Sequence, residues 1–152
     1  MLNFYCISVE GIDKTGKELI RKYLDILGKH KYVLMDRGII SNVAYAKLWH
    51  RPYSYELSVF KDWLFVYLTT DKEDWEVRCK LTNEPKIDYD LNKSIFDETV
   101  NEFVKLGFQT LTFNTSQMTP YSIAKAIITY MESYEQNRKV ELENGKDCAC
   151  QT

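Results

Sequence analysis

The residues with the clearest potential for chemistry are two glycines and a lysine near the start of the chain. Gly11 and Gly16 enclose a short segment that Lys17 follows directly, with the sequence GIDKTGK over residues 11–17. Glycine allows the backbone to curl so that successive N–H groups point inward, and a lysine at this spacing can reach the outer phosphates of a nucleotide. The pattern therefore predicts a phosphate-binding loop.

The segments on either side of this loop are the ones that such a loop requires. The preceding residues 4–9 are nearly all apolar and predict a buried strand of a parallel sheet. The following residues 19–27 carry apolar side chains at helical spacing up to Gly28, and the free N–H groups at the start of a helix attract anions. An accidental glycine-bounded loop is the alternative, but strand, loop and helix fall in the order that the motif predicts. Glu18 stands where the motif has a serine or threonine that binds magnesium.

Asp36 and Arg37 form a second candidate site after a short predicted strand, residues 32–35. Only three residues separate this strand from the preceding helix, so the strand–helix–strand unit should be a right-handed crossover with parallel strands. Asp36 and Arg37 would then lie at the same sheet edge as the loop, where ligands of open α/β sheets bind. A carboxylate can hold magnesium or its waters, and a guanidinium can bind a phosphate with two parallel hydrogen bonds. The alternative is a surface ion pair.

The rest of the chain alternates predicted helices and strands. This alternation predicts an α/β three-layer sandwich with a small, mostly parallel sheet of about four strands. We expect Ser41, Asp71 and Thr119 to be the N-caps of three helices. We expect one helix that starts after Ser41 and ends before Pro52, and further helices over 53–60, 72–81, 94–106 and 120–133. Strands are expected over 63–68 and 109–113, and a mobile loop over 82–90.

Composition indicates one soluble, cytoplasmic domain. The 152 residues are 45% hydrophobic with a net charge of −2, which gives no reason to expect nucleic-acid binding, and no apolar run approaches the ~20 residues that span a bilayer. We expect a domain over residues 1–135 and a polar, flexible tail over 136–152. The four cysteines show no spacing of a disulfide framework or zinc site; Cys148 and Cys150 could bind a metal, but a solvated tail fits better.

Four motifs resemble thymidylate kinases and deoxynucleoside kinases, which are P-loop kinases. VEGIDKTGK is similar to the phosphate loop of thymidylate kinases, and VLMDRGIISNVAYAKL resembles the Asp-Arg segment of both families. VYLTTDKEDWEVRCK resembles the strand and arginine-bearing helix that lead into their lid, and FNTSQMTPYSIAKAI their final strand, adenine-side loop and last helix. The resemblance covers most of residues 3–131 and implies the fold of P-loop nucleoside and nucleotide kinases.

The resemblance also implies roles for individual residues, with ATP and Mg²⁺ as cofactors and small-molecule nucleotides as partners. For Tyr45, packing against the core is an equal alternative to bordering the acceptor base. For Arg51, a solvated loop charge is preferred over contact with a phosphate. Residues 114–117 can line the adenine, form a simple connection, or do both. The implied catalytic residues are Lys17, Asp36, Arg37 and Arg78; the ATP-binding residues are Gly11, Asp13, Lys14, Thr15, Gly16, Lys17, Glu18, Asn114 and Thr115; the acceptor-binding residues are Arg37, Ser41, Tyr45 and Arg51; and the metal ligands are Asp36 and Glu18.

Three departures leave two functional hypotheses. Glu18 replaces the magnesium hydroxyl, the lid offers Arg78, Lys80 and Lys86 where the family has more arginine, and a segment that carries an acceptor-phosphate arginine in thymidylate kinases is absent before Asp36. The first hypothesis is a kinase that transfers a phosphoryl group from ATP to a nucleoside or nucleoside monophosphate. The second is a catalytically degenerate relative that binds a nucleotide or a protein. A homodimer is left open.

Overall fold

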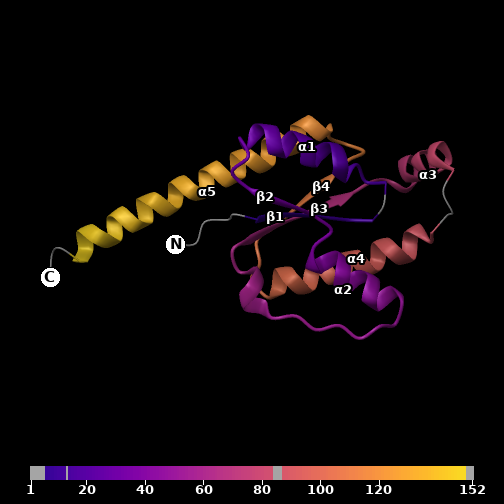
Figure 1. Ribbon diagram of the computed structural model, residues 1–152, viewed down its shortest axis with the longest axis horizontal. Helices are drawn as coiled ribbons and strands as arrows, with labels where there is room; N and C mark the ends of the chain where they lie inside the picture. Colours follow the sequence, from indigo (N-terminus) through magenta and orange to yellow (C-terminus); the bar gives the residue numbers. More distant parts are fainter. Residues whose placement is uncertain (1–5, 13, 84–86, 150–152) are drawn as a thin grey trace.

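The computed structural model describes residues 6–12, 14–83 and 87–149 and shows an α/β fold with one four-stranded sheet (Figure 1). All strand pairs are parallel, and the strand order is β2-β1-β3-β4. The strands are β1 (Cys6–Glu10), β2 (Val33–Asp36), β3 (Trp63–Thr69) and β4 (Thr110–Asn114). The helices are α1 (Lys17–Leu27), α2 (Ile39–Leu48), α3 (Lys72–Thr82), α4 (Tyr89–Lys105) and α5 (Pro120–Ala149), with a 3₁₀ turn at Leu57–Phe60.

The sheet lies between two layers of helices, which confirms the three-layer architecture. Helices α1 and α5 cover one face, and α2 and α4 cover the other (Figure 1). Side chains alternate between the two faces along each strand. In β3, Leu64, Val66 and Leu68 join the core under α1 and α5, whereas Phe65 and Tyr67 join the core under α2 and α4.

The parallel register brings the carboxyl ends of the strands to one edge. Val9 pairs with Asp36, Glu10 pairs with Tyr67, and Thr69 pairs with Asn114. The loop over residues 11–17 and the Asp36-Arg37 segment therefore start side by side at this edge, as the sequence predicted. Helix α3 and residues 115–119 also begin there.

The beginnings of two helices differ from their predictions. Helix α2 starts at Ile39, so Ser41 is a residue of its first turn and the prediction of Ser41 as N-cap is wrong. A carboxylate from β1, described below, caps this helix instead. Helix α4 starts at Tyr89 and not at residue 94, because the Asp88 carboxylate accepts a hydrogen bond from the Leu91 N–H at 3.1 Å. The predicted mobile loop over 82–90 is correspondingly shorter, and its residues 84–86 lie outside the described ranges.

Other caps and turns follow local sequence more closely. Asp71 precedes α3 as its N-cap, and Thr119 Oγ1 accepts a hydrogen bond from the Ser122 N–H at 3.2 Å at the start of α5. Both residues therefore stand at their predicted N-cap positions, but the Asp71 side chain accepts no hydrogen bond from α3, whereas Thr119 caps α5. Of the predicted helix over 53–60, residues 53–56 have no regular secondary structure and Leu57–Phe60 form a single 3₁₀ turn. Tyr55 stacks on Phe103 of α4 with ring centroids 5.3 Å apart, and this tertiary contact competes with helix formation.

Helix α5 is longer than the sequence pattern predicted. It continues to Ala149, and its second half projects beyond the sheet (Figure 1). The residues after Tyr134 are rich in Glu, Lys, Gln and Arg, which are good helix formers even without a packed face. The flexible character of residues 136–152, and hence the domain boundary at residue 135, stays a prediction. Among the described residues, no helix combines the length and apolar character needed to cross a membrane.

Candidate functional site

The loop over residues 11–17 encloses the ammonium group of Lys17. Lys17 Nζ donates to the backbone oxygens of Gly11 at 3.0 Å and Ile12 at 2.8 Å, and it lies 3.5 Å from Thr15 Oγ1. The side chain is buried, and this burial lowers its pKa to about 8, although the negative charges of Asp36 and Glu10 act in the opposite direction. A desolvated cation at the centre of a loop is suited to bind an anion that replaces the loop carbonyls.

Two glycines give this loop its shape. Gly11 has a φ of 143°, and a Cβ at this position would lie 2.5 Å from the Leu68 oxygen. Gly16 has a φ of 84° and is the N-cap of α1, where no side chain accepts a hydrogen bond from the helix. The N–H groups of the first turn of α1 are thereby left without a side-chain cap at the loop, as anion binding requires. Asp13, a predicted ATP-binding residue, lies outside the described residues.

Glu10 is a residue of this site that sequence reasoning missed. It is the last residue of β1, it is fully buried, and it points to the face covered by α2. Its Oε1 accepts hydrogen bonds from Ser8 Oγ at 2.7 Å and from the Gly38 N–H at 2.9 Å. Its Oε2 accepts from the Ser41 N–H at 2.9 Å and from Ser41 Oγ. The available signal was a carboxylate at the end of an otherwise uncharged buried strand, directly before Gly11.

Asp36 and Arg37 lie next to the loop at the end of β2. Asp36 is partly exposed and forms a 3.5 Å ion pair with Arg21 of α1. Its charge also raises the pKa of Lys17 against the effect of burial, which places the two groups within electrostatic reach. Arg37 has a φ of 60°, and its N–H donates to the Val9 oxygen at 3.0 Å, so its backbone is tied to β1.

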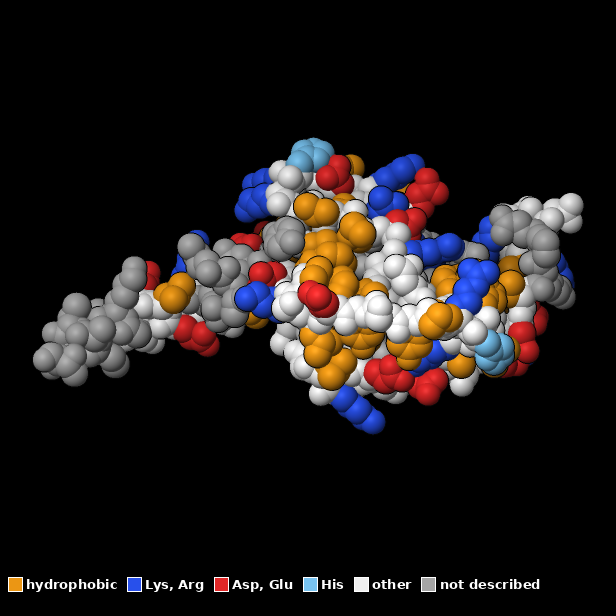
Figure 2. All heavy atoms as spheres, turned by 60° about the horizontal axis from the view of Figure 1, so that its bottom comes forward, with side chains coloured by type: hydrophobic (Ala, Val, Ile, Leu, Met, Phe, Trp, Pro, Cys, Tyr) orange, Lys and Arg blue, Asp and Glu red, His pale blue; other side chains and the backbone are white. Residues whose placement is uncertain are grey.

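A cavity of about 570 Å³ opens between α2 and the start of α4. Its size falls in the range of small-molecule sites, and its lining combines apolar walls with a few polar groups. Figure 2, which turns the α2 and α4 side toward the reader, shows hydrophobic and basic side chains next to each other on this face. Three predicted acceptor residues, Arg37, Ser41 and Tyr45, line this cavity together. The other lining residues are Asn42, Leu48, Trp49, Ile87, Asp88, Leu91 and Asn92.

Tyr45 and Arg51 take different places around this cavity. The Arg37 guanidinium lies over the Tyr45 ring, 5.8 Å from the ring centroid. The Tyr45 ring also stacks on Trp49 and contacts Phe96 of the core edge-to-face. Tyr45 therefore lines the cavity and packs against the core at once. Arg51 lies over the Trp49 ring at 5.1 Å and lines a neighbouring cavity of about 390 Å³, so the structure does not bring it together with Arg37.

Arg78 reaches the loop from helix α3. Its Nη1 donates to the Lys14 oxygen at 2.7 Å and to Thr115 Oγ1 at 3.3 Å. Thr115 Oγ1 in turn donates to the Thr69 oxygen at 3.0 Å. Arg78 thus connects the loop after β1 with the segment after β4, and it adds a second cation beside Lys17.

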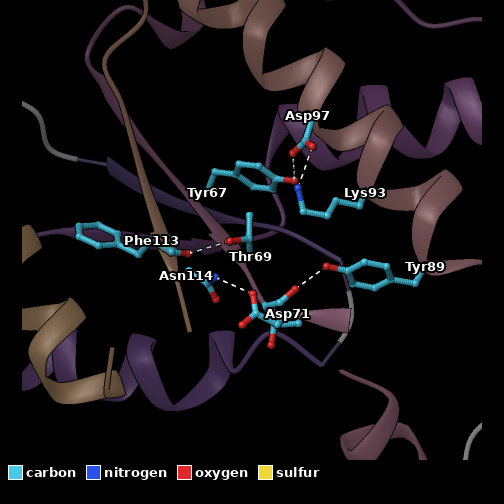
Figure 3. Close-up of polar contacts among 9 residues, drawn as sticks. Tyr67, Thr69, Asp71, Tyr89, Lys93, Asp97, Phe113 and Asn114 are labelled. Carbon is cyan, nitrogen blue, oxygen red and sulfur yellow. Dashed lines mark hydrogen bonds and ion pairs between the residues drawn. The ribbon is translucent and has the colours of Figure 1, made fainter. Parts of the chain in front are cut away.

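The segment after β4 is fixed to the start of α3 by its own polar side chains. Asn114 Nδ2 donates to Asp71 Oδ1 at 2.9 Å, as Figure 3 shows, and Asn114 Oδ1 accepts from the Ser116 N–H at 2.9 Å. Figure 3 also shows the Tyr89 hydroxyl directed toward this region, where it donates to the Thr70 oxygen. The Asn114 and Thr115 side chains are thus used to shape the segment, and their contact with an adenine stays a prediction.

The predicted metal ligands Asp36 and Glu18 do not belong to a preformed cluster of metal-binding side chains among the described residues. Among the described residues there is no group of three or more His, Cys, Asp or Glu side chains arranged to hold a metal ion. Glu18 is exposed on the first turn of α1 and lines a cavity together with Arg21, which is the ion-pair partner of Asp36. Magnesium often uses only one or two carboxylates together with phosphates and water, so Asp36 and Glu18 are compatible with that role, which stays a prediction. Cys150 and the Cys148 side chain lie outside the description.

Comparisons with known proteins support the fold. No protein-family model and no curated protein matches the chain. Among solved structures, the chain is similar to the crystal structure of the YorR protein from Bacillus subtilis in complex with phosphorylated GDP. The TM-score is 0.57 at 21% sequence identity, over 86% of this chain and 98% of YorR. At this identity the similarity shows a shared α/β fold.

Proposed function

We propose that this protein is a P-loop kinase that transfers a phosphoryl group from ATP to a nucleoside or nucleoside monophosphate, in the manner of thymidylate and deoxynucleoside kinases. One observation carries the proposal: Lys17 lies at the centre of the glycine-bounded loop while Arg78, from another helix, binds the Lys14 oxygen of the same loop. Two cations thus converge where the motif places the donor phosphates. The nucleotide bound to YorR, a protein of similar fold, adds support.

The arrangement of charges suits phosphoryl transfer, which depends mainly on positioning and electrostatic stabilisation. Lys17 would exchange the Gly11 and Ile12 oxygens for the outer phosphate oxygens of ATP. Arg78 would stabilise the charge of the transferred group. Magnesium, when bound, would neutralise the outer phosphates, and Asp36 is placed to hold it or its waters. The acceptor would occupy the cavity between α2 and α4, with its phosphate or hydroxyl near Arg37.

In this reaction the bond between the γ-phosphorus and the bridging oxygen breaks, and a bond from the acceptor oxygen to phosphorus forms. ADP leaves with the bridging oxygen, and the acceptor's proton passes to solvent or to a nearby carboxylate. Asp36 is a partly exposed carboxylate at the sheet edge. Glu10 is excluded from this proton transfer because it is buried and already accepts four hydrogen bonds.

A catalytically degenerate nucleotide-binding protein is the second candidate. Glu18 favours it, since a carboxylate in the first turn of α1 adds negative charge near the phosphates and lacks the hydroxyl of the motif. The same loop would then bind ATP without transferring its phosphoryl group.

Magnesium-dependent ADP release from ATP, measured with a panel of nucleosides and nucleoside monophosphates, distinguishes these functions. The kinase proposal expects release that depends on one class of acceptor and disappears in Lys17→Ala. ATP binding by calorimetry without release under any acceptor would support the degenerate alternative. Absence of ATP binding by the wild-type protein would contradict both.

A further inference from the structure

Glu10 accepts hydrogen bonds that a role in binding ATP does not require. It belongs to β1 and directly precedes Gly11, yet its carboxylate binds residues that follow β2. The Gly38 N–H and the Ser41 N–H, 28 and 31 residues further along the chain, donate to its two oxygens at 2.9 Å each. Ser8 and the Ser41 hydroxyl complete the set of four donors. With all four in place, the carboxylate has no free acceptor site for a substrate proton.

The carboxylate caps helix α2 from outside the helix. No side chain of the segment itself caps this N-terminus, where Gly38 is the N-cap residue. A negative charge at a helix N-terminus satisfies the free N–H groups and interacts favourably with the helix dipole. Gly38 permits the approach, since a Cβ at this position would lie 2.8 Å from Glu10 Oε1 and even closer to Ser8 Oγ.

The two residues whose N–H groups Glu10 binds, Gly38 and Ser41, follow shortly after the predicted acceptor residue Arg37 in the chain. Arg37 directly precedes Gly38, and its own N–H is bound to the Val9 oxygen at 3.0 Å. Backbone N–H groups of Arg37 and of the next residue are therefore both bound to β1, the strand that leads into the loop. Ser41 and Tyr45, which line the cavity with Arg37, lie on successive turns of the helix that Glu10 caps.

We infer that Glu10 is a positioning residue for the acceptor side of the site: it fixes the start of α2, and with it Arg37 and the cavity wall, relative to the loop after β1. This inference rests on the proposed function for the identity of the acceptor. It does not place Glu10 in contact with ATP, because its carboxylate points to the α2 face of the sheet and its partners lie there.

The test is the nearly isosteric variant Glu10→Gln. The amide replaces one acceptor oxygen by an NH₂ group, which opposes the N–H donors of Gly38 or Ser41. We expect nucleoside monophosphates to bind about tenfold more weakly, the scale of a lost charge-assisted hydrogen bond, with a matching rise in KM. ATP affinity should change less than twofold. Amide hydrogen exchange at the start of α2 should accelerate while exchange in α5 stays as in the wild type.

Ser8→Ala is the matched control, since it removes one donor from Glu10 and leaves the Gly38 and Ser41 N–H donors in place. Acceptor affinity in this variant should stay within about twofold of the wild type. Equal losses of ATP and acceptor affinity in Glu10→Gln, or unchanged acceptor affinity, would overturn the inference. Should Glu10→Gln fail to fold, Gly38→Ala disturbs the same contact from the helix side and must give the same selective loss.

The two proposals fail separately. Wild-type protein that binds ATP but no nucleoside or monophosphate contradicts the proposed acceptor, whatever Glu10 does. In that case hydrogen exchange decides the role of Glu10: accelerated exchange restricted to the start of α2 supports it, and unchanged exchange there contradicts it.

Discussion

Arg78 Nη1 lies 2.7 Å from the backbone oxygen of Lys14, so a guanidinium of helix α3 rests on the loop that precedes helix α1. The contact spans 64 residues of the chain. A carbonyl oxygen is a weaker partner for a guanidinium than a phosphate, because the phosphate carries full negative charge. A bound nucleotide can therefore take over this cation from Lys14.

Replacing Arg78 by Gln tests this exchange. Turnover should fall about 100-fold or more, as for the loss of one group that stabilises transition-state charge, with ATP affinity reduced only a few-fold. Arg78→Lys keeps the charge but loses the planar fork, so its turnover should lie between those of the wild type and Arg78→Gln. Steady-state rates and calorimetric ATP titrations give both quantities. Unchanged turnover in Arg78→Gln would remove Arg78 from the catalytic residues.

Replacing Lys17 by Ala should abolish ATP binding and leave the fold intact. Within residues 6–12, 14–83 and 87–149, the lysine's hydrogen bonds go to its own loop and not to the apolar core. Calorimetry measures binding, and circular dichroism with thermal unfolding checks the fold. Unchanged ATP affinity would refute the assignment of residues 11–17 as a phosphate-binding loop.

The pKa of Lys17 predicts a pH dependence of ATP binding. Burial lowers this pKa from 10.5 to about 8 in the free protein, and a bound phosphate should raise it again. Binding is then fully favoured below pH 8 and weakens, by up to about tenfold per pH unit, as the pH rises through 8, since the protein must take up a proton. Calorimetry between pH 7.5 and 9.5 in two buffers counts that proton. ATP binding that takes up no proton at pH 9.5 would contradict the lowered pKa of Lys17.

The same pKa predicts the pH dependence of stability. Because the folded pKa lies below the unfolded value, the unfolded chain binds more protons between about pH 8 and 10.5. The free energy of unfolding contributed by Lys17 therefore rises with pH across this window and is constant below it. The free energy of unfolding of wild type and of Lys17→Met can be measured with denaturant at pH 7 and pH 9.5. The value for wild type minus the value for Lys17→Met should be larger at pH 9.5 than at pH 7. A difference that does not change with pH would contradict the lowered pKa.

Glu18→Thr tests whether the glutamate limits a working kinase. The substitution removes a negative charge from the first turn of α1 and restores the hydroxyl of the motif, so magnesium–ATP should bind more tightly and turnover should increase. Glu18→Gln, which removes only the charge, separates the two effects. Loss of activity in Glu18→Thr would instead indicate that Glu18 is itself a metal ligand, and inactivity of both wild type and variant would favour the non-catalytic alternative.

Arg37→Lys tests the acceptor side. The variant keeps the charge but loses the bidentate fork, so a nucleoside monophosphate should bind about tenfold or more weakly, whereas ATP affinity should hardly change. Arg51→Lys is a matched control, since Arg51 lines the neighbouring cavity and should have little effect on either ligand. Weaker ATP binding with unchanged monophosphate binding would mean that the acceptor lies elsewhere.

The sequence by itself determined the features that depend on short-range patterns. The alternation of apolar periods predicted the α/β sandwich and its four strands, and all four are present within a residue or two of their predicted bounds. The glycine and lysine spacing after the first strand placed residues 11–17 at the carboxyl edge of the sheet. The N-cap positions of Asp71 and Thr119 were recognisable because the residue preference at a helix start depends only on the adjoining turn.

Only the tertiary structure decided the contacts between segments that lie far apart in the chain. Glu10 caps α2 across 31 residues, and Arg78 reaches Lys14 across 64. No local pattern encodes such pairs, because a helix can be capped by any carboxylate that the sheet register brings to its N-terminus. The start of α2 was therefore misplaced at Ser41, and Glu10 was overlooked: a buried carboxylate finds its partners only after the strands have paired.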